Sequence, residues 1–376
     1  MLDHADSHAR RSARWIRLVV NLAVLSILAQ TVRAEPAPWP TSGWPTSTPA
    51  AQALDGDRLN ELAGLIREGE EFPNVHSLLV VRNGYLVLEE YFAGHDADDL
   101  HDVQSVTKSF TSAAVGIAVG EGRIAGIDAK VLDFFPDTSG IENLDDRKRA
   151  ITIENLLTMR SGTDYHEHSP GSPHHQLNAL THGWSEFYLS RPMVSDPGTR
   201  FQYDSGGVVL LSAILKARTG RHADALLSDR VFKPLGIEKS WWFKNAEGHP
   251  HTGGGLRLRP RDMAKFGLLY LREGRWEDKQ VLPRAWVKAS LTQHVTFPEK
   301  RGPFVGYGYL WWIFEPDPQG NGKERIYAAC GFRAQYIFVV PEHKMVVVVT
   351  GGTLNQSDMY KPTEFLYSHI LPAVGR

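Results

Sequence analysis

The chain has 376 residues, of which 42% are hydrophobic and 22% are charged, a composition typical of a folded protein with a sizeable core. Its 41 lysine and arginine residues nearly balance its 43 aspartate and glutamate residues. The chain therefore has no excess of basic residues that would bind a polyanion, and we expect no nucleic-acid partner. The single cysteine, Cys330, excludes an intrachain disulfide and a zinc site made of several cysteines.

Residues 1–34 have the pattern of an export signal. Arginines at positions 10, 11, 14 and 17 precede an apolar run from Leu18 to about Ala29, and Val32-Arg33-Ala34 then supplies small residues at cleavage spacing. The apolar run is too short to cross a membrane. We therefore predict a cleaved signal peptide, an exported protein that is periplasmic or secreted, and no membrane span in the mature chain. A buried N-terminal helix and an uncleaved anchor are the alternatives.

The next predicted segment is an extended linker, residues 35–56, because it is dense in proline, serine, threonine and tryptophan. A helix is expected from about Asp57 to Gly69, where leucine and isoleucine recur at helical spacing. The dipeptide Asn83-Gly84 lies between two apolar runs. This arrangement is typical of a two-residue β-hairpin turn, because both central positions need a positive φ.

Helical periodicity dominates the middle of the chain, and strand patterns return near its end. The expected segments are helices at 108–119, 208–217, 263–271 and 363–371, and a strand pair at 335–340 and 345–350. We therefore predict an α/β (α+β) fold, in which residues 57–104 and 270–376 form an antiparallel sheet flanked by helices. Residues 105–269 are expected to form a mainly helical lobe inserted between the two halves of the sheet.

The first candidate for chemistry is Ser105-Val106-Thr107-Lys108, at the head of an apolar helix. The three-residue spacing places Ser105 and Lys108 on one helical face. A lysine amine that is desolvated enough to be neutral can accept the serine proton. The helix N-terminus also aims the Ser105 N–H at a developing oxyanion. A Ser-x-x-Lys pattern is expected about once by chance in a chain of this composition, so it needs support.

Two further segments supply that support. Residues 197–207 place Tyr203 and Ser205 on a glycine-flanked turn just before a helix. Ala329-Cys330-Gly331 precedes the strand at 335–340, where backbone N–H groups can complete an oxyanion hole.

In their order and surroundings, these segments resemble the serine β-lactamase-like superfamily, specifically its class C branch, which also holds D,D-peptidases, esterases and 6-aminohexanoate-dimer hydrolases. The resemblance covers nearly all of the chain after Trp44, and includes the segments 156–162, 253–256 and 307–312. It implies a β-lactamase/transpeptidase-like fold. It also implies that Ser105 is the nucleophile, that Lys108 activates it, and that Tyr203 carries the proton to the leaving group.

The resemblance implies a substrate-binding wall as well. The backbone N–H groups of Ser105 and of Phe332, the residue after Gly331, would bind the oxyanion. Ser205 stands where the family often has asparagine, so a shorter and weaker contact to Lys108 or to substrate is expected there. The third motif often begins with lysine or histidine, but this chain has Ala329. That departure leaves a substrate carboxylate without its cation, and Arg333 is the nearest substitute.

For the remaining residues that could be reactive, we expect structural rather than catalytic roles. We expect Cys330 to be a small hydrophobic residue rather than a nucleophile. Five histidines crowd the segment 166–182, but their spacing follows no helix or strand face. We expect this segment to be a loop at the mouth of the site, and we predict no metal-binding residues and no cofactor. Trp311 and Trp312 are interpreted as one core and one rim residue.

The sequence thus predicts an exported serine hydrolase that cleaves a small ester or amide through an acyl-enzyme on Ser105. One alternative on the same fold is a D,D-peptidase or β-lactamase. Another is a non-catalytic envelope binding protein, although a binding protein has no need of Ser105, Lys108 and Tyr203 together.

Overall fold

The computed structural model describes residues 37–167, 169–316 and 325–375. The predicted signal peptide, residues 1–34, lies outside these residues and stays a prediction. Within the described part of the chain, no helix is both long and apolar enough to cross a membrane.

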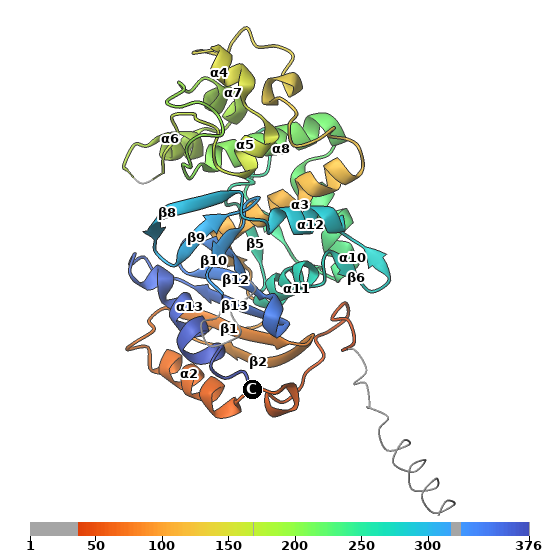
Figure 1. The fold of residues 1–376 in the computed structure, drawn as a ribbon, viewed down its shortest axis with the longest axis vertical. Coiled ribbons are helices and arrows are strands. Elements are labelled where there is room, and N and C mark those ends of the chain that lie inside the picture. The colour runs from red at the N-terminus through yellow and green to blue at the C-terminus, as the bar shows by residue number, and fades with distance from the viewer. Residues whose placement is uncertain (1–36, 168, 317–324, 376) are drawn as a thin grey trace, which may run out of the picture. The chain divides into compact units, whose positions relative to one another are not determined.

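The core element is an eight-stranded antiparallel sheet with the strand order β2-β1-β13-β12-β11-β10-β9-β8 (Figure 1). Its strands are β1 (Val75–Arg82), β2 (Tyr85–Tyr91), β8 (Val295–Arg301), β9 (Phe304–Tyr307), β10 (Trp312–Phe314), β11 (Ile326–Gly331), β12 (Gln335–Val340) and β13 (Met345–Gly351). The first two come from the N-terminal part of the chain and the other six from the C-terminal part. The α/β fold and the predicted antiparallel sheet are therefore confirmed.

The β1–β2 hairpin forms where the sequence predicts it. Asn83 and Gly84 have φ values of 54° and 93°, so both turn residues adopt the left-handed region that a tight hairpin requires.

At the centre of the sheet, every residue of β12 and β13 is buried. β13 begins at Met345 and continues through four consecutive valines, residues 346–349, all of which are fully buried. A strand that is covered on both faces has no solvent-facing positions, so its sequence is continuously apolar instead of alternating. The valine run of β13 is therefore explained by the central position of this strand in the sheet.

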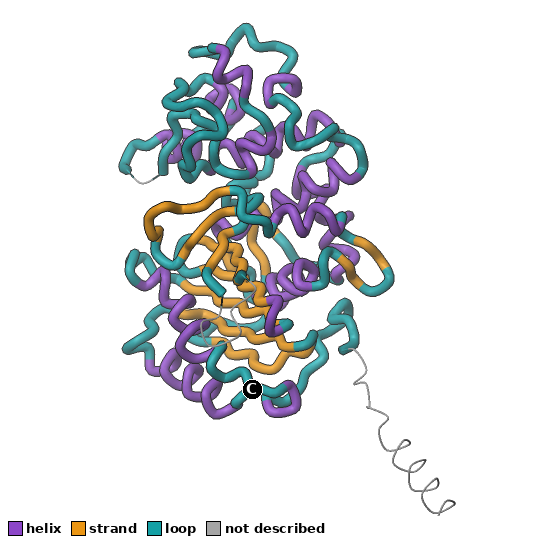
Figure 2. Tube along the Cα trace, in the orientation of Figure 1, coloured by secondary structure: helices purple, strands orange, loops and turns teal. Residues whose placement is uncertain are grey.

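Helices cover the sheet and form the inserted lobe. Their bounds are α2 (Gly56–Glu68), α3 (Thr107–Gly120), α4 (Asp146–Ala150), α5 (Ile153–Leu157), α6 (Pro173–Ala179), α7 (Trp184–Leu189), α8 (Ser205–Thr219), α9 (Ala223–Leu227), α10 (Lys233–Leu235), α11 (Pro260–Leu271), α12 (Arg284–Ser290) and α13 (Lys361–Glu364). Figures 1 and 2 show α4 to α8 gathered at one end of the sheet as a helical lobe. The C-terminal helix continues past α13 as a π-helical segment, Phe365–Ile370, which packs beside α2.

Three short strands lie beside the main sheet. They are β3 (His101–Asp102), β5 (Leu256–Leu258) and β4 (Trp241–Trp242), which pair in that order. A separate hairpin consists of β6 (Arg275–Trp276) and β7 (Lys279–Gln280). The pairing of β3 with β5 ties the segment before Ser105 to the loop that follows the helical lobe.

The segment predicted to be an extended linker, residues 35–56, contacts the folded body at several of its described positions. The Trp39 and Trp276 rings lie 5.1 Å apart, and the Leu86 N–H donates to the Pro45 carbonyl over 2.9 Å. Burying large aromatic rings favours this packing over an extended solvated chain. The predicted lobe boundary between residues 269 and 270 falls inside α11, which packs on the sheet.

A glycine sets the distance between α11 and the sheet. A Cβ at Gly267 would lie 2.5 Å from Val346 Cγ1 and 2.8 Å from Ile337 Cγ2. Real side chains do not approach this closely, so the helix packs against β12 and β13 only because position 267 has no side chain.

We expect Gly267→Ala to lower the free energy of unfolding by about 1–2 kcal/mol, because overpacking outweighs the gain in helix propensity. The matched control is Gly64→Ala in α2, where an added Cβ meets no atom within 4 Å. That variant should be neutral or more stable. Urea unfolding followed by circular dichroism measures both, and equal stabilities for the two variants would contradict the packing argument.

Candidate active site

Ser105 lies in a 3-10 turn, Gln104–Val106, directly before α3 rather than within the helix. The preceding residue, Gln104, has a φ of 51°, a strained conformation for a residue with a side chain. Asp102 holds this turn, because its carboxylate accepts hydrogen bonds from the Gln104 backbone N–H over 3.1 Å and from Gln104 Nε2 over 2.7 Å. The turn therefore presents Ser105 in a fixed orientation.

Lys108 is the second residue of α3 and is only 1% exposed. Its Nζ donates to Ser105 Oγ over 2.8 Å and to the Gly253 carbonyl over 2.5 Å. The contact to Ser105 is the one that the Ser-x-x-Lys spacing predicts. The contact to Gly253 comes from a loop 145 residues away, which the sequence alone does not reveal.

Burial lowers the pKa of the Lys108 ammonium to about 8, while the carboxylates of Glu167 and Asp204 act in the opposite direction. A lysine with its ordinary pKa is almost entirely protonated at neutral pH. The shift leaves Lys108 with a substantial neutral fraction just above neutrality, and a neutral amine is able to accept a proton.

Tyr203 lies beside this pair. Lys108 Nζ is 4.8 Å from the centre of the Tyr203 ring, and that ring stacks on Trp312 at 5.7 Å. Desolvation and the charge of Glu167 raise the pKa of the phenol well above its usual value, and a hydrogen bond with Ser105 opposes them. Tyr203 is therefore a protonated phenol at neutral pH.

The two residues that follow Tyr203, at the start of α8, are held by hydrogen bonds to carboxylates. Asp204 caps this helix by accepting from the Gly207 N–H over 2.8 Å, and it also accepts from the Tyr188 hydroxyl over 2.5 Å. Burial raises the pKa of Asp204 to about 6, although these hydrogen bonds oppose that effect. The next residue, Ser205, donates its backbone N–H to Glu167 Oε1 over 2.7 Å. Two carboxylates thus fix the backbone that follows Tyr203.

The end of β11 forms a further side of the site, next to the segment that precedes Ser105. A Cβ at Gly331 would lie 2.4 Å from the Val103 carbonyl oxygen, so glycine allows this strand to meet the segment before Ser105. Ala329 is 1% exposed and belongs to the core. Cys330 lines the cavity, and burial raises the pKa of its thiol well above the usual value. A protonated thiol is a poor nucleophile, in agreement with the sequence interpretation.

These walls enclose a cavity of about 670 Å³. The predicted site residues that line it are Ser105, Tyr203, Ser205, Gly331 and Phe332. Lys108 lies behind Ser105, hydrogen-bonded to it. Arg333 is not among the lining residues, because it is exposed in the β11–β12 turn, with its guanidinium 6.0 Å from the Phe332 ring. The tertiary structure does not bring it into the cavity.

The histidine-rich segment borders the cavity, in agreement with its expected position at the mouth of the site, although the sequence assigns none of its residues a role there. Glu167, His174 and His175 come from the histidine-rich segment, and the two histidines lie on α6 rather than on a loop. His168 lies outside the described residues. Trp312 lines the cavity and Trp311 is buried, as the rim-and-core interpretation predicts. Glu167 belongs to no recognisable motif, because only folding brings it to the Ser205 N–H and close enough to Lys108 for its charge to act there.

Comparison with known proteins identifies the class. A β-lactamase family model matches residues 62–363, so the chain belongs to the β-lactamase family, within the serine β-lactamase-like superfamily. A 6-aminohexanoate-dimer hydrolase of Paenarthrobacter ureafaciens is 26% identical over 336 residues, which span 82% of this chain and 81% of the relative. A lovastatin esterase of Penicillium rubens is 27% identical over 186 residues, 44% of each chain. The chain is accordingly a hydrolase of this family.

A solved structure agrees at the level of the fold. The octameric penicillin-binding protein homologue from Pyrococcus abyssi aligns with a TM-score of 0.63 at 23% identity. The alignment covers 83% of this chain and 77% of that one. The β-lactamase/transpeptidase-like fold expected from the sequence motifs is therefore confirmed.

Proposed function

We propose that the protein hydrolyses a small ester or amide through an acyl-enzyme formed on Ser105. The observation that carries the proposal is the 2.8 Å hydrogen bond between Lys108 Nζ and Ser105 Oγ, with the amine buried and its pKa lowered. A hydroxyl becomes a good nucleophile when a neutral base within hydrogen-bond reach takes its proton.

The proton path follows from the protonation states. Ser105 Oγ attacks the substrate carbonyl carbon while its proton passes to the Lys108 amine. The tetrahedral intermediate then collapses, and the leaving group receives a proton from the Tyr203 phenol, which Lys108 reprotonates. Because the pKa of Tyr203 is raised, its phenol is present as the acid that this step needs. In the second half, water attacks the acyl carbon and its proton is relayed through the Tyr203 phenol to the neutral Lys108 amine. Lys108 then returns this proton to Ser105 Oγ as the acyl–oxygen bond breaks.

The negative oxygen of each intermediate needs hydrogen-bond donors. We assign this role to the backbone N–H groups of Ser105 and Phe332, which lie on the two walls that Gly331 allows to meet. Backbone donors fixed by a strained turn and a strand end need no reorganisation during the reaction.

The lining of the cavity favours an uncharged, partly apolar substrate. Four of its aromatic residues are at least 37% exposed: Trp241, Phe243, Phe332 and Tyr360. Asp102 and Glu167 also line it and repel a carboxylate. Arg257 is the only lysine or arginine among the described lining residues, and its guanidinium lies 4.8 Å from the centre of the Trp241 ring. A 6-aminohexanoate-dimer hydrolase and an esterase among the relatives fit an amide or ester substrate.

The nucleophile assignment is tested by covalent labelling. We expect a fluorophosphonate to add once to the natural chain, because the activated Ser105 hydroxyl attacks phosphorus as it would a carbonyl carbon. Intact-mass measurement should show one adduct, and Ser105→Ala should show none. Ser109→Ala is the matched control, because Ser109 is buried with its hydroxyl bonded to the Leu310 carbonyl, and this variant should still be labelled. Labelling that persists in Ser105→Ala would refute the assignment.

The base assignment is tested by pH dependence. We expect kcat/KM for a neutral p-nitrophenyl ester to rise with pH and level off above about pH 8, because only the neutral Lys108 amine accepts the proton. Glu167→Gln removes a charge that raises the pKa of Lys108, so the rising limb should move to lower pH.

Lys108→Arg is the companion variant in that experiment. Arginine stays protonated throughout this pH range, so kcat should fall by at least about a hundredfold. A natural enzyme whose kcat/KM does not change between about pH 6 and pH 9 would show that Lys108 is not the titrating base.

The substrate preference is tested with matched esters. We expect a neutral p-nitrophenyl ester to exceed its carboxylate-bearing analogue, and a chromogenic cephalosporin, by at least about a hundredfold in kcat/KM. The described lining sets one cation, Arg257, against the carboxylates of Asp102 and Glu167, and a desolvated carboxylate that is poorly compensated costs several kcal/mol. Residual turnover of the carboxylate ester should fall in Arg257→Ala and stay unchanged in Arg333→Ala, whose side chain is outside the cavity. Equal turnover of both esters by the natural chain would refute the preference, and faster cephalosporin turnover would favour a β-lactamase.

A further inference from the structure

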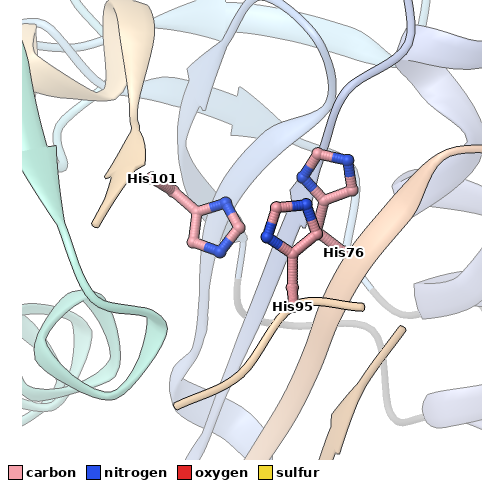
Figure 3. A group of neighbouring side chains, drawn as sticks. All are labelled: His76, His95 and His101. Carbon is pink, nitrogen blue, oxygen red and sulfur yellow. The ribbon is translucent and has the colours of Figure 1, made fainter. Parts of the chain in front are cut away.

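Three histidines from separate segments meet beside β3, outside the cavity lining described above. They are His76 in β1, His95 in the β2–β3 connection and His101 in β3. One ring nitrogen from each lies within 4.8 Å of the others, and Figure 3 shows the three rings grouped together. None of the three is among the residues that line the cavity.

An irregularity in β1 orients the first histidine. The pairing of β1 with β13 shifts register between Val75 and Ser77, so His76 is the extra residue of a β-bulge. Bulges redirect a side chain that a regular strand would point elsewhere. Gly352 makes room for the redirected ring, because a Cβ there would lie 2.6 Å from His76 Nε2.

A tight turn brings the second histidine to the first. The His95 N–H donates to the Phe92 carbonyl over 3.0 Å, and the two residues between them, Ala93 and Gly94, have φ values of 54° and 82°. The His95 ring consequently stacks on His76 with 3.9 Å between ring centres. His101 completes the group, with its ring centre 5.0 Å from that of His95.

The ring nitrogens are available as ligands. His76 Nδ1 and His101 Nε2 are buried without a hydrogen-bond partner among the described residues. A buried polar atom without a partner costs about 1–3 kcal/mol, so two in one cluster indicate a missing ligand. His95 Nδ1 is 2.8 Å from Asp99 Oδ2. A carboxylate only accepts, so Nδ1 is the donor and Nε2 of the neutral ring keeps its lone pair.

We propose that His76, His95 and His101 bind one divalent transition-metal ion of the zinc class, with Asp99 orienting His95 from the second coordination sphere. Three imidazoles leave a fourth tetrahedral position for water. Zinc–nitrogen bonds of about 2.0–2.1 Å place ligand nitrogens about 3.3 Å apart, so the rings draw together by rotation when the ion binds. The His95 side chain is 32% exposed and gives the ion a path from solvent. No metal site was expected from the sequence, because only the fold brings these three segments together.

None of the three histidines lines the Ser105 cavity, so we expect the ion to act on the stability of the fold rather than on the ester or amide substrate. An ion there joins the start of β1, the β2–β3 connection and β3. His101 lies four residues before Ser105 and next to Asp102, the residue that holds the Ser105 turn. Metal binding is therefore expected to raise the melting temperature, as any ligand specific to the folded state does.

The test is a zinc titration of the chelator-treated full chain by isothermal calorimetry, with circular dichroism as the check on folding. We expect one Zn²⁺ per chain, a higher melting temperature on binding, and a cobalt-substituted protein with the visible spectrum of tetrahedral Co²⁺. His95→Ala, at a partly exposed loop position, should weaken zinc binding by at least about a hundredfold. Asp99→Asn should weaken it about tenfold, the scale typical of an outer-sphere partner.

The control is the double variant His174→Ala/His175→Ala, which removes two histidines of the histidine-rich segment 166–182. It should bind zinc as the natural chain does. Binding that survives in His95→Ala but is lost in the double variant would overturn the proposal, as would a natural chain that binds no zinc at micromolar concentration. Neither outcome bears on the Ser105 mechanism, which the labelling experiment tests separately.

Discussion

Burial of the Lys108 amine against Ser105 is the constraint on which the rest of the site depends. An ammonium group removed from water is costly unless fixed acceptors surround it, and a partly satisfied one loses its proton readily. The structure supplies two acceptors, Ser105 Oγ and the Gly253 carbonyl, and leaves the pKa at about 8. Tyr203 covers the amine, and Glu167 limits the shift. The same burial that weakens the ammonium makes Lys108 available as a base.

Close backbone approaches make this burial possible. α3 passes through the interior with nearly every residue covered, so its first turn has no contact with bulk water. Gly331 lets the end of β11 meet the segment before Ser105, and Gly267 lets α11 rest on the sheet. A side chain at position 331 would separate β11 from the segment before Ser105, and a side chain at position 267 would push α11 away from β12 and β13. Gly331 therefore links the packing of the sheet to the geometry of the site.

The segment from His101 to Lys108 connects the two sites. Its first residue belongs to the histidine cluster, Asp102 holds the strained Gln104 turn, and Ser105 and Lys108 follow directly. A strained turn persists only when its surroundings determine it. An ion bound at His101 adds one more restraint to that segment, at its end away from Ser105. The proposed substrate preference depends on the exposed aromatic residues and the acidic residues that line the same cavity.

The sequence by itself determined what is encoded locally: the Asn83-Gly84 hairpin, the strand segments near both ends of the chain, and the pair of Ser105 and Lys108 three residues apart. These follow from turn chemistry, periodicity and motif spacing, which need no distant partner. Only the tertiary structure decided that Glu167 and Gly253 reach Lys108, that Arg333 stays outside the cavity, and that three unrelated histidines converge. Such contacts depend on a bulge, a turn or a strand pairing between segments far apart, and no local pattern records them.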